Sequence, residues 1–248
     1  MRLVFFLTTL VLTGWVYLNI VHAQVRTSNN YQIQSDSINV GGGLSSSTNY
    51  SLESTAGEVA TGPSDGTTYN LRAGYQQMQE VFLSLTGGAD VNMTPSLPGV
   101  GGGISNGSTT LTAVTDSPSG YQLTIEASES PAMTSGSNTI ADYSPSGDPD
   151  LVFTTASVDA HLGYSPFGND VVQKFQTNGS VCNVSGSASS TACWEGLSTT
   201  AETISQSSSP NQPAGTDTTI YFKVGIGPSV VQIAGTYVAT STVTLLAL

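Results

Sequence analysis

A histidine beside an acid is the first feature of this sequence that could support chemistry. His161 follows Asp159 by two residues, and a Ser-His-Asp hydrolase would need it as general base. With 35 serines in 248 residues, the presence of a serine nucleophile carries no information. A single histidine in a strand-like segment is typical of a packed or surface side chain, so we predict that the protein is not an enzyme.

Two pairs of carboxylates raise the questions of glycoside hydrolysis and of cation binding. Glu126 and Glu129 form one pair, and Asp148 and Asp150 form the other. The second pair lacks the Asp/Asn spacing of a calcium loop, and the glycine run 99–103 lacks the Lys-Ser/Thr of a phosphate loop. We interpret all four carboxylates as solvated surface charges, with calcium at Asp148 and Asp150 as the alternative. No metal and no cofactor are expected.

The two cysteines, Cys182 and Cys193, bracket a serine-rich stretch. In an exported chain, two cysteines this close together predict a structural disulfide. A metal site is the alternative, but two thiols without nearby histidines do not complete a tetrahedral ligand set.

The composition excludes several classes of protein. Only 5 Lys and Arg stand against 17 Asp and Glu, a net charge of −12, so the clustered cations that neutralise nucleic-acid phosphates are lacking. The residues that build long amphipathic helices are scarce, whereas Ser, Thr and Gly are abundant. The sequence therefore predicts an all-β protein that does not bind nucleic acid.

Residues 1–23 have the pattern of a secretory signal peptide. A basic start at Arg2 precedes an apolar run from Leu3 to Ile20, and small residues end at Ala23. We expect cleavage after Ala23, so the protein would contact the membrane only through residues 1–23, before they are removed. An uncleaved anchor is the alternative, because the run is just long enough to span a bilayer.

Residues 24–79 contain three similar units of 19 residues. In each unit a tyrosine and an Ile or Leu alternate with polar residues, which is the period of a half-buried strand. Glycine-rich and proline-containing turns separate the units. We predict a small antiparallel sheet whose apolar face supports assembly through Tyr31, Ile33, Tyr50, Leu52, Tyr69 and Leu71.

Residues 80–248 have the pattern of a larger β-domain. Segments of period two, separated by Gly, Pro and Ser turns, predict an immunoglobulin-like antiparallel β-sandwich preceded by the repeat sheet. The segment 116–120 between two such runs has a strong hairpin signature. Residues 128–150 and 165–215 are expected to be long loops. The clearest strand patterns cover 81–85, 109–115, 121–127, 219–226 and 235–248.

Two of these segments resemble a family. The stretch Gly107–Ile125 is similar to the central hairpin of secreted bacterial surface β-sandwich proteins of the WxL-like, spore-coat-like and fimbrial-subunit-like kind, and Ala234–Leu245 is similar to their last strand. The repeat that ends in Leu71–Tyr75 resembles the leader that precedes such sandwiches. The resemblance implies a structural or adhesive role at the cell surface rather than catalysis.

We therefore expect a secreted surface protein that forms a filament or coat by strand exchange. The final strand, 236–248, has no charge and no proline, and the polar lead 24–30 could add to such an edge in a neighbouring copy. The partners would be copies of itself or other surface proteins. The alternative is a monomeric adhesin that binds protein or glycans through loop aromatics, namely Tyr143, Tyr164 and Phe167.

Overall fold

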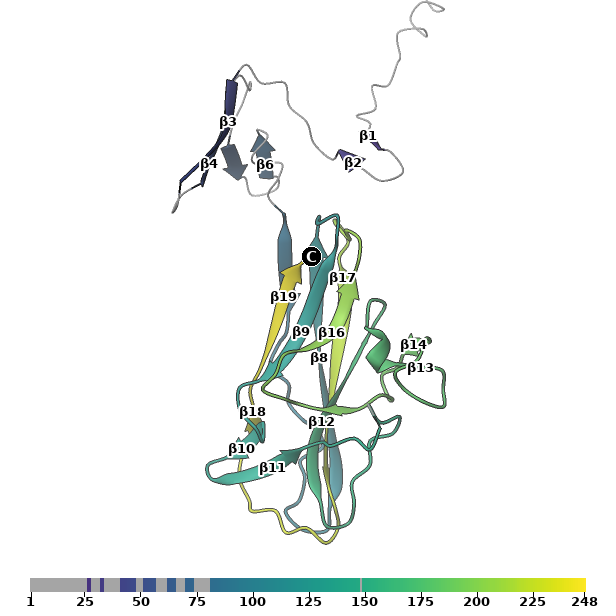
Figure 1. Ribbon diagram of the computed structural model, residues 1–248. Helices are drawn as coiled ribbons and strands as arrows, with labels where there is room; N and C mark the ends of the chain where they lie inside the picture. The colour runs from purple at the N-terminus through teal and green to yellow at the C-terminus, as the bar shows by residue number, and fades with distance from the viewer. Residues whose placement is uncertain are drawn as a thin grey trace, which may run out of the picture. The chain divides into compact units, whose positions relative to one another are not determined.

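The computed structural model divides the chain into two compact units, residues 1–80 and 81–248, which are considered separately. It describes residues 26–27, 32–33, 41–47, 51–56, 62–65, 70–73, 81–147 and 149–248. Over these residues the protein is all-β, as the composition predicts, and its one helical element is the single 3-10 turn η1 (Gln173–Phe175) (Figure 1).

The described parts of the N-terminal unit are three antiparallel pairs of strands. Ile33, Leu52 and Leu71 each lie in the second strand of a pair, whereas Tyr31, Tyr50 and Tyr69 lie outside the described residues. Among the described residues, the repeat forms three two-stranded sheets. The pairs are β1 (Arg26–Thr27) with β2 (Gln32–Ile33), β3 (Gly41–Ser46) with β4 (Ser51–Ala56), and β5 (Gly62–Asp65) with β6 (Asn70–Ala73).

The C-terminal unit is a β-sandwich of two main sheets. The larger sheet has the order β18-β10-β11-β12-β17-β8-β7, with β15 also paired to β12, and the smaller sheet has the order β16-β9-β19. The larger sheet is mixed rather than wholly antiparallel, because β11 and β12 pair in parallel. Its strands are β7 (Leu83–Gly87), β8 (Gly103–Thr115), β10 (Met133–Ser135), β11 (Asn138–Asp142), β12 (Ala160–Gly168), β15 (Glu195–Gly196), β17 (Thr216–Ile226) and β18 (Val238–Ala239).

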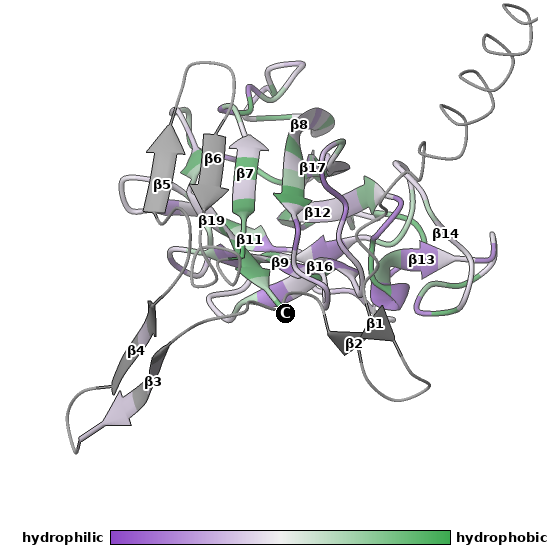
Figure 2. Ribbon diagram, turned by 90° about the horizontal axis from the view of Figure 1, so that it is seen from above, coloured by the Kyte–Doolittle hydropathy of each residue, from purple (hydrophilic) through white to green (hydrophobic). Residues whose placement is uncertain are grey.

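The smaller sheet supplies the centre of the core. It consists of β9 (Tyr121–Ala127) flanked by β16 (Glu202–Ser207) and β19 (Ser241–Ala247). Alternate residues of β9 point inward and are fully or almost fully buried, as are alternate residues of β8 and β17. Hydrophobic and polar segments alternate along these strands (Figure 2). The inward residues include Leu111, Ala113, Tyr121, Leu123, Ile125, Ile220 and Val224.

The predicted hairpin at 116–120 is wrong, although the turn itself exists. The N–H of Gly120 donates to the Ser117 carbonyl at 2.9 Å, and Gly120 has a φ of +81° that favours glycine. The strands on either side, β8 and β9, belong to different sheets, so the turn is a corner of the sandwich. β9 is the central strand of its own sheet, because β16 and β19 occupy both of its edges.

The two predicted long loops are also partly wrong. Residues 128–150 contain β10 and β11, and residues 165–215 contain the end of β12 and all of β16. Small and polar residues, mostly serine and threonine, supply much of these strands, so their composition resembles that of a loop. The rest of the second segment holds η1, β13 (Gln176–Thr177) and β14 (Ser187–Ala188), which pairs with β13.

Candidate functional site

His161 lies in a small aromatic cluster rather than in a catalytic triad. Its ring meets that of Tyr143 edge to face at 5.8 Å, and its Nε2 lies 4.0 Å from an oxygen of Asp159. Residues 103–107 match the Gly-x-Ser-x-Gly pattern of a nucleophile elbow, a match that the sequence analysis missed. The segment lies inside β8 and leads to no helix, and Ser105 is buried there, so the pattern is coincidental.

Asp150 organises a loop instead of presenting its charge to a cation. Its carboxylate accepts hydrogen bonds from the Tyr143 hydroxyl at 2.8 Å, from the Gly147 N–H at 2.8 Å and from the N–H and hydroxyl of Ser146 at 3.0 and 2.9 Å. Burial alone would raise the pKa of Asp150, but these hydrogen bonds lower it below its ordinary value. Asp148 lies outside the described residues, among which no group of three metal-ligating side chains occurs.

Two of the three aromatic residues expected in ligand-binding loops are buried. Tyr164 is 1% exposed inside β12, and Tyr143 is 6% exposed and stacks on Phe153 with ring centroids 4.7 Å apart. Tyr164 points inward from β12, and Tyr143 directly follows β11 and packs on Phe153, so neither ring is presented at the end of a long loop. Phe167, also on β12, is 42% exposed and meets Tyr221 edge to face at 6.4 Å.

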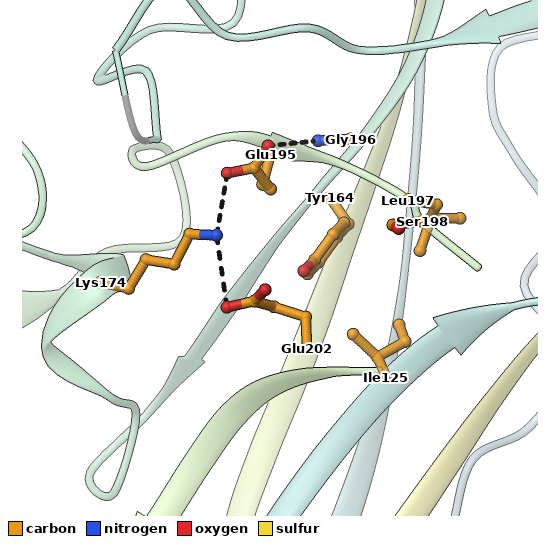
Figure 3. Close-up of a pocket in the computed structure, with 8 residues that line it drawn as sticks. All are labelled: Ile125, Tyr164, Lys174, Glu195, Gly196, Leu197, Ser198 and Glu202. Carbon is orange, nitrogen blue, oxygen red and sulfur yellow. Dashed lines mark hydrogen bonds and ion pairs between the residues drawn. The ribbon is translucent and has the colours of Figure 1, made fainter. Parts of the chain in front are cut away.

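A small pocket beside β16 holds a lysine between two glutamates, an arrangement that the sequence did not indicate. The Lys174 ammonium lies 3.3 Å from a carboxylate oxygen of Glu195 and 3.3 Å from one of Glu202 (Figure 3). Burial alone would lower the pKa of Lys174, but the two negative charges raise it above its ordinary value. The single cation is shared by the two carboxylates, which makes this cluster a brace between η1, β15 and β16.

A disulfide joins Cys182 to Cys193, with Cα atoms 5.6 Å apart. It lies within residues 169–201, the connection from β12 to β16, which we call the cover. Phe175, in the same connection, is fully buried against the ring of Tyr164 at 5.7 Å. The disulfide thus closes a loop within the cover, whereas the buried ring of Phe175 and the ion pair of Lys174 with Glu202 attach the cover to the sandwich.

The cover protects the outer edge of β16, which we call the covered edge. Backbone groups of residues 170–172 pair with β16, and the register of β16 on β9 shifts between Thr203 and Ser205, which is a bulge. The main-chain hydrogen bonds run from Val172 N–H to the Ile204 carbonyl at 3.2 Å and from Gln206 N–H to the Asp170 carbonyl at 2.8 Å.

The other outer strand of this sheet, β19, has no such protection, and we call its outer side the open edge. All seven residues of β19 pair with β9, and β19 pairs with no other strand in the described part of the chain. β7 approaches it without forming a ladder. Val243 and Leu245 point inward but are only half-buried, whereas Thr242, Thr244 and Leu246 are exposed. An unpaired edge without charge or proline is a template for another strand.

Comparisons with protein-family models, with curated proteins and with solved structures found no match to this chain.

Proposed function

We propose that the protein is a secreted structural protein of the cell surface whose copies join by strand exchange into a filament or coat. The observation that carries the proposal is the open edge: the seven uncharged residues of β19 pair with β9 on one side, and on the other side β19 has no ladder partner among the described residues. A donated strand would pair with these groups and would cover the exposed flanks of Val243 and Leu245.

The proposed donor is the N-terminal region of another copy. Its first hairpin, β1 with β2, is held by only two residue pairs, whereas β3 with β4 has six. Of the three described hairpins of this region, the first therefore has the fewest backbone hydrogen bonds to break when it is released. A contact between the N-terminal region of one copy and the open edge of the next does not close on itself, so it propagates as a chain of subunits.

Export is part of the same proposal. Residues 1–23 have the signal-peptide pattern, and the Cys182–Cys193 disulfide is typical of an oxidising compartment outside the cytoplasm. In the part of the chain that the structure describes, no helix is long and apolar enough to cross a membrane. The partners would be copies of the same chain or other surface proteins.

The experiment that tests the proposal is the deletion of residues 24–47. Strand exchange predicts that the full protein forms ordered polymers in negative-stain micrographs, and that the shortened protein stays folded but is monomeric by light scattering. If the N-terminal region instead folds back on its own sandwich, the full protein is a monomer even at high concentration. That result would favour the alternative, a monomeric adhesin, for which the exposed ring of Phe167 is the supporting observation.

A further inference from the structure

The outer face of the larger sheet carries a short row of side chains that the assembly proposal does not use. Ile220 and Val224 of β17 are buried, so Tyr221 and Lys223, which both lie between them and alternate with them along the strand, point to the opposite face. Phe167 of the neighbouring strand β12 is in edge-to-face contact with Tyr221. We call Phe167, Tyr221 and Lys223 the outer strip.

Lys223 differs from the braced Lys174 in its surroundings. Its ammonium lies 4.2 Å from the ring centroid of Trp194 and 5.6 Å from that of Phe153. Among the described residues no carboxylate pairs with it, whereas Lys174 is held by two glutamates. Burial lowers the pKa of Lys223, and an anionic group bound at the ammonium would offset this loss of hydration. The cation is thus positioned by aromatic rings, and no carboxylate of the described residues pairs with it.

Polar side chains border the outer strip on the β8 side. In the register of β8 on β17, Asn106 lies opposite Lys223, Ser108 opposite Tyr221 and Thr110 opposite Thr219. Directly opposite residues of an antiparallel pair share a face, so these side chains lie beside the strip, and all three from β8 are exposed. β8, β17 and β12 run side by side in Figure 1.

This combination has the chemistry of an acidic sugar chain. The exposed ring of Phe167 offers an apolar surface for the C–H face of a sugar, and the hydroxyl and amide groups of β8 match its hydroxyls. The ammonium of Lys223 matches a carboxylate. With a net charge of −12, the protein exerts no general attraction on polyanions, so selection for a carboxylate must be local.

We infer that the outer strip binds an oligosaccharide that contains a carboxylate-bearing sugar such as a uronic acid. The site is independent of strand exchange, because it lies on the larger sheet, whereas the open edge belongs to the smaller one. A surface polymer with this strip would present one saccharide site on each subunit.

Trp194 provides a direct readout, because Lys223 lies over its ring. Residues 24–248, the protein after the expected cleavage, contain Trp194 as their one tryptophan, so Trp194 is the single fluorophore. This protein is titrated with trigalacturonate, with the neutral trisaccharide maltotriose and with sodium acetate. We expect saturable fluorescence change with trigalacturonate, at least about tenfold weaker binding of maltotriose, and no saturation with acetate in the same concentration range.

Substitutions in the outer strip test whether trigalacturonate binds there. Lys223→Met and Phe167→Ala should each weaken trigalacturonate binding about tenfold or more in calorimetry, while Phe82→Ala, an exposed ring elsewhere on the unit, changes it less than about twofold. Circular dichroism spectra that match the parent show that the variants fold. The inference is overturned if trigalacturonate does not bind, if maltotriose binds equally well, or if Lys223→Met binds like the parent. Thr244→Lys, at the open edge, should bind like the parent whether or not the protein polymerises.

Discussion

The two outer strands of the smaller sheet differ in the protection of their outer sides. β16 is bulged, and residues 170–172 pair with its outer side, so its backbone groups are occupied. β19 is straight and fully paired on its inner side, and on its outer side it has neither charge nor proline nor a described partner. Because proteins normally protect exposed sheet edges, the contrast within one sheet points to the open edge as the functional one.

The protection of β16 comes from tertiary contacts and not from β16 itself. The cover is attached by the ring of Phe175 and by the brace at Lys174, and the disulfide closes a loop within it. Weakening each of these should expose the covered edge by a different amount. The outer side of β16 would then be less protected and more similar to that of β19.

Replacing Phe175 by alanine should have the largest effect on stability. Its side chain is fully buried, so the cavity and the lost apolar contact should lower the free energy of unfolding by about 3–5 kcal/mol. Urea unfolding followed by circular dichroism measures this loss. The control is Phe82→Ala, whose ring is 45% exposed and should cost no more than about 0.5 kcal/mol. Equal costs for the two variants would show that the cover is not packed as described.

Removing the disulfide should have the next largest effect. The double variant Cys182→Ser, Cys193→Ser should lose about 3 kcal/mol, the loop-closure entropy of a short loop. Thermal unfolding of the parent with and without reductant should reproduce the difference, and the double variant should not respond to reductant. Free thiols titrating in the native, unreduced protein would contradict the bridge.

Of these three features, the lysine brace should contribute least to the free energy of unfolding. Lys174→Gln should destabilise the protein by about 1 kcal/mol near neutral pH, because the brace is partly exposed to solvent. The pKa of Lys174 is raised on folding, so its contribution is fully present below the ordinary value of 10.5 and is lost as the pH rises through the raised pKa. The stability difference between parent and variant should therefore shrink above pH 10.5. A difference that stays constant into that range would mean that the charge of Lys174 is not what stabilises the cover.

The sequence predicted the strands well where apolar and polar residues alternate, as in β9, whose bounds match the predicted 121–127. It could not predict which sheet each strand would join, because a short turn such as 116–120 serves a hairpin or a corner equally well. β16 was missed because serine, threonine and glutamine supply most of its residues. Tyr164 is buried because it points inward from β12, whose last residues fall in the segment that was expected to be a loop.

Only part of the candidate site could be predicted from the sequence. The absence of charge and proline in the last strand could be read directly, and it indicated an unprotected edge. The protection of β16 could not be read, since it depends on residues 170–172 meeting a strand more than thirty positions later in the chain. The pairing of Phe167 with Tyr221 likewise depends on strand register.

The most direct test of the account is sedimentation velocity of two variants that add the same positive charge to the two edges. Thr244→Lys places it at an exposed position of β19, and Gln206→Lys places it at an exposed position of β16. A lysine on an edge strand disfavours pairing with another chain. We predict that Thr244→Lys is monomeric at concentrations where the parent and Gln206→Lys form polymers. Polymers of Thr244→Lys indistinguishable from those of the parent, or equal loss in both variants, would contradict the assignment of β19 as the assembling edge.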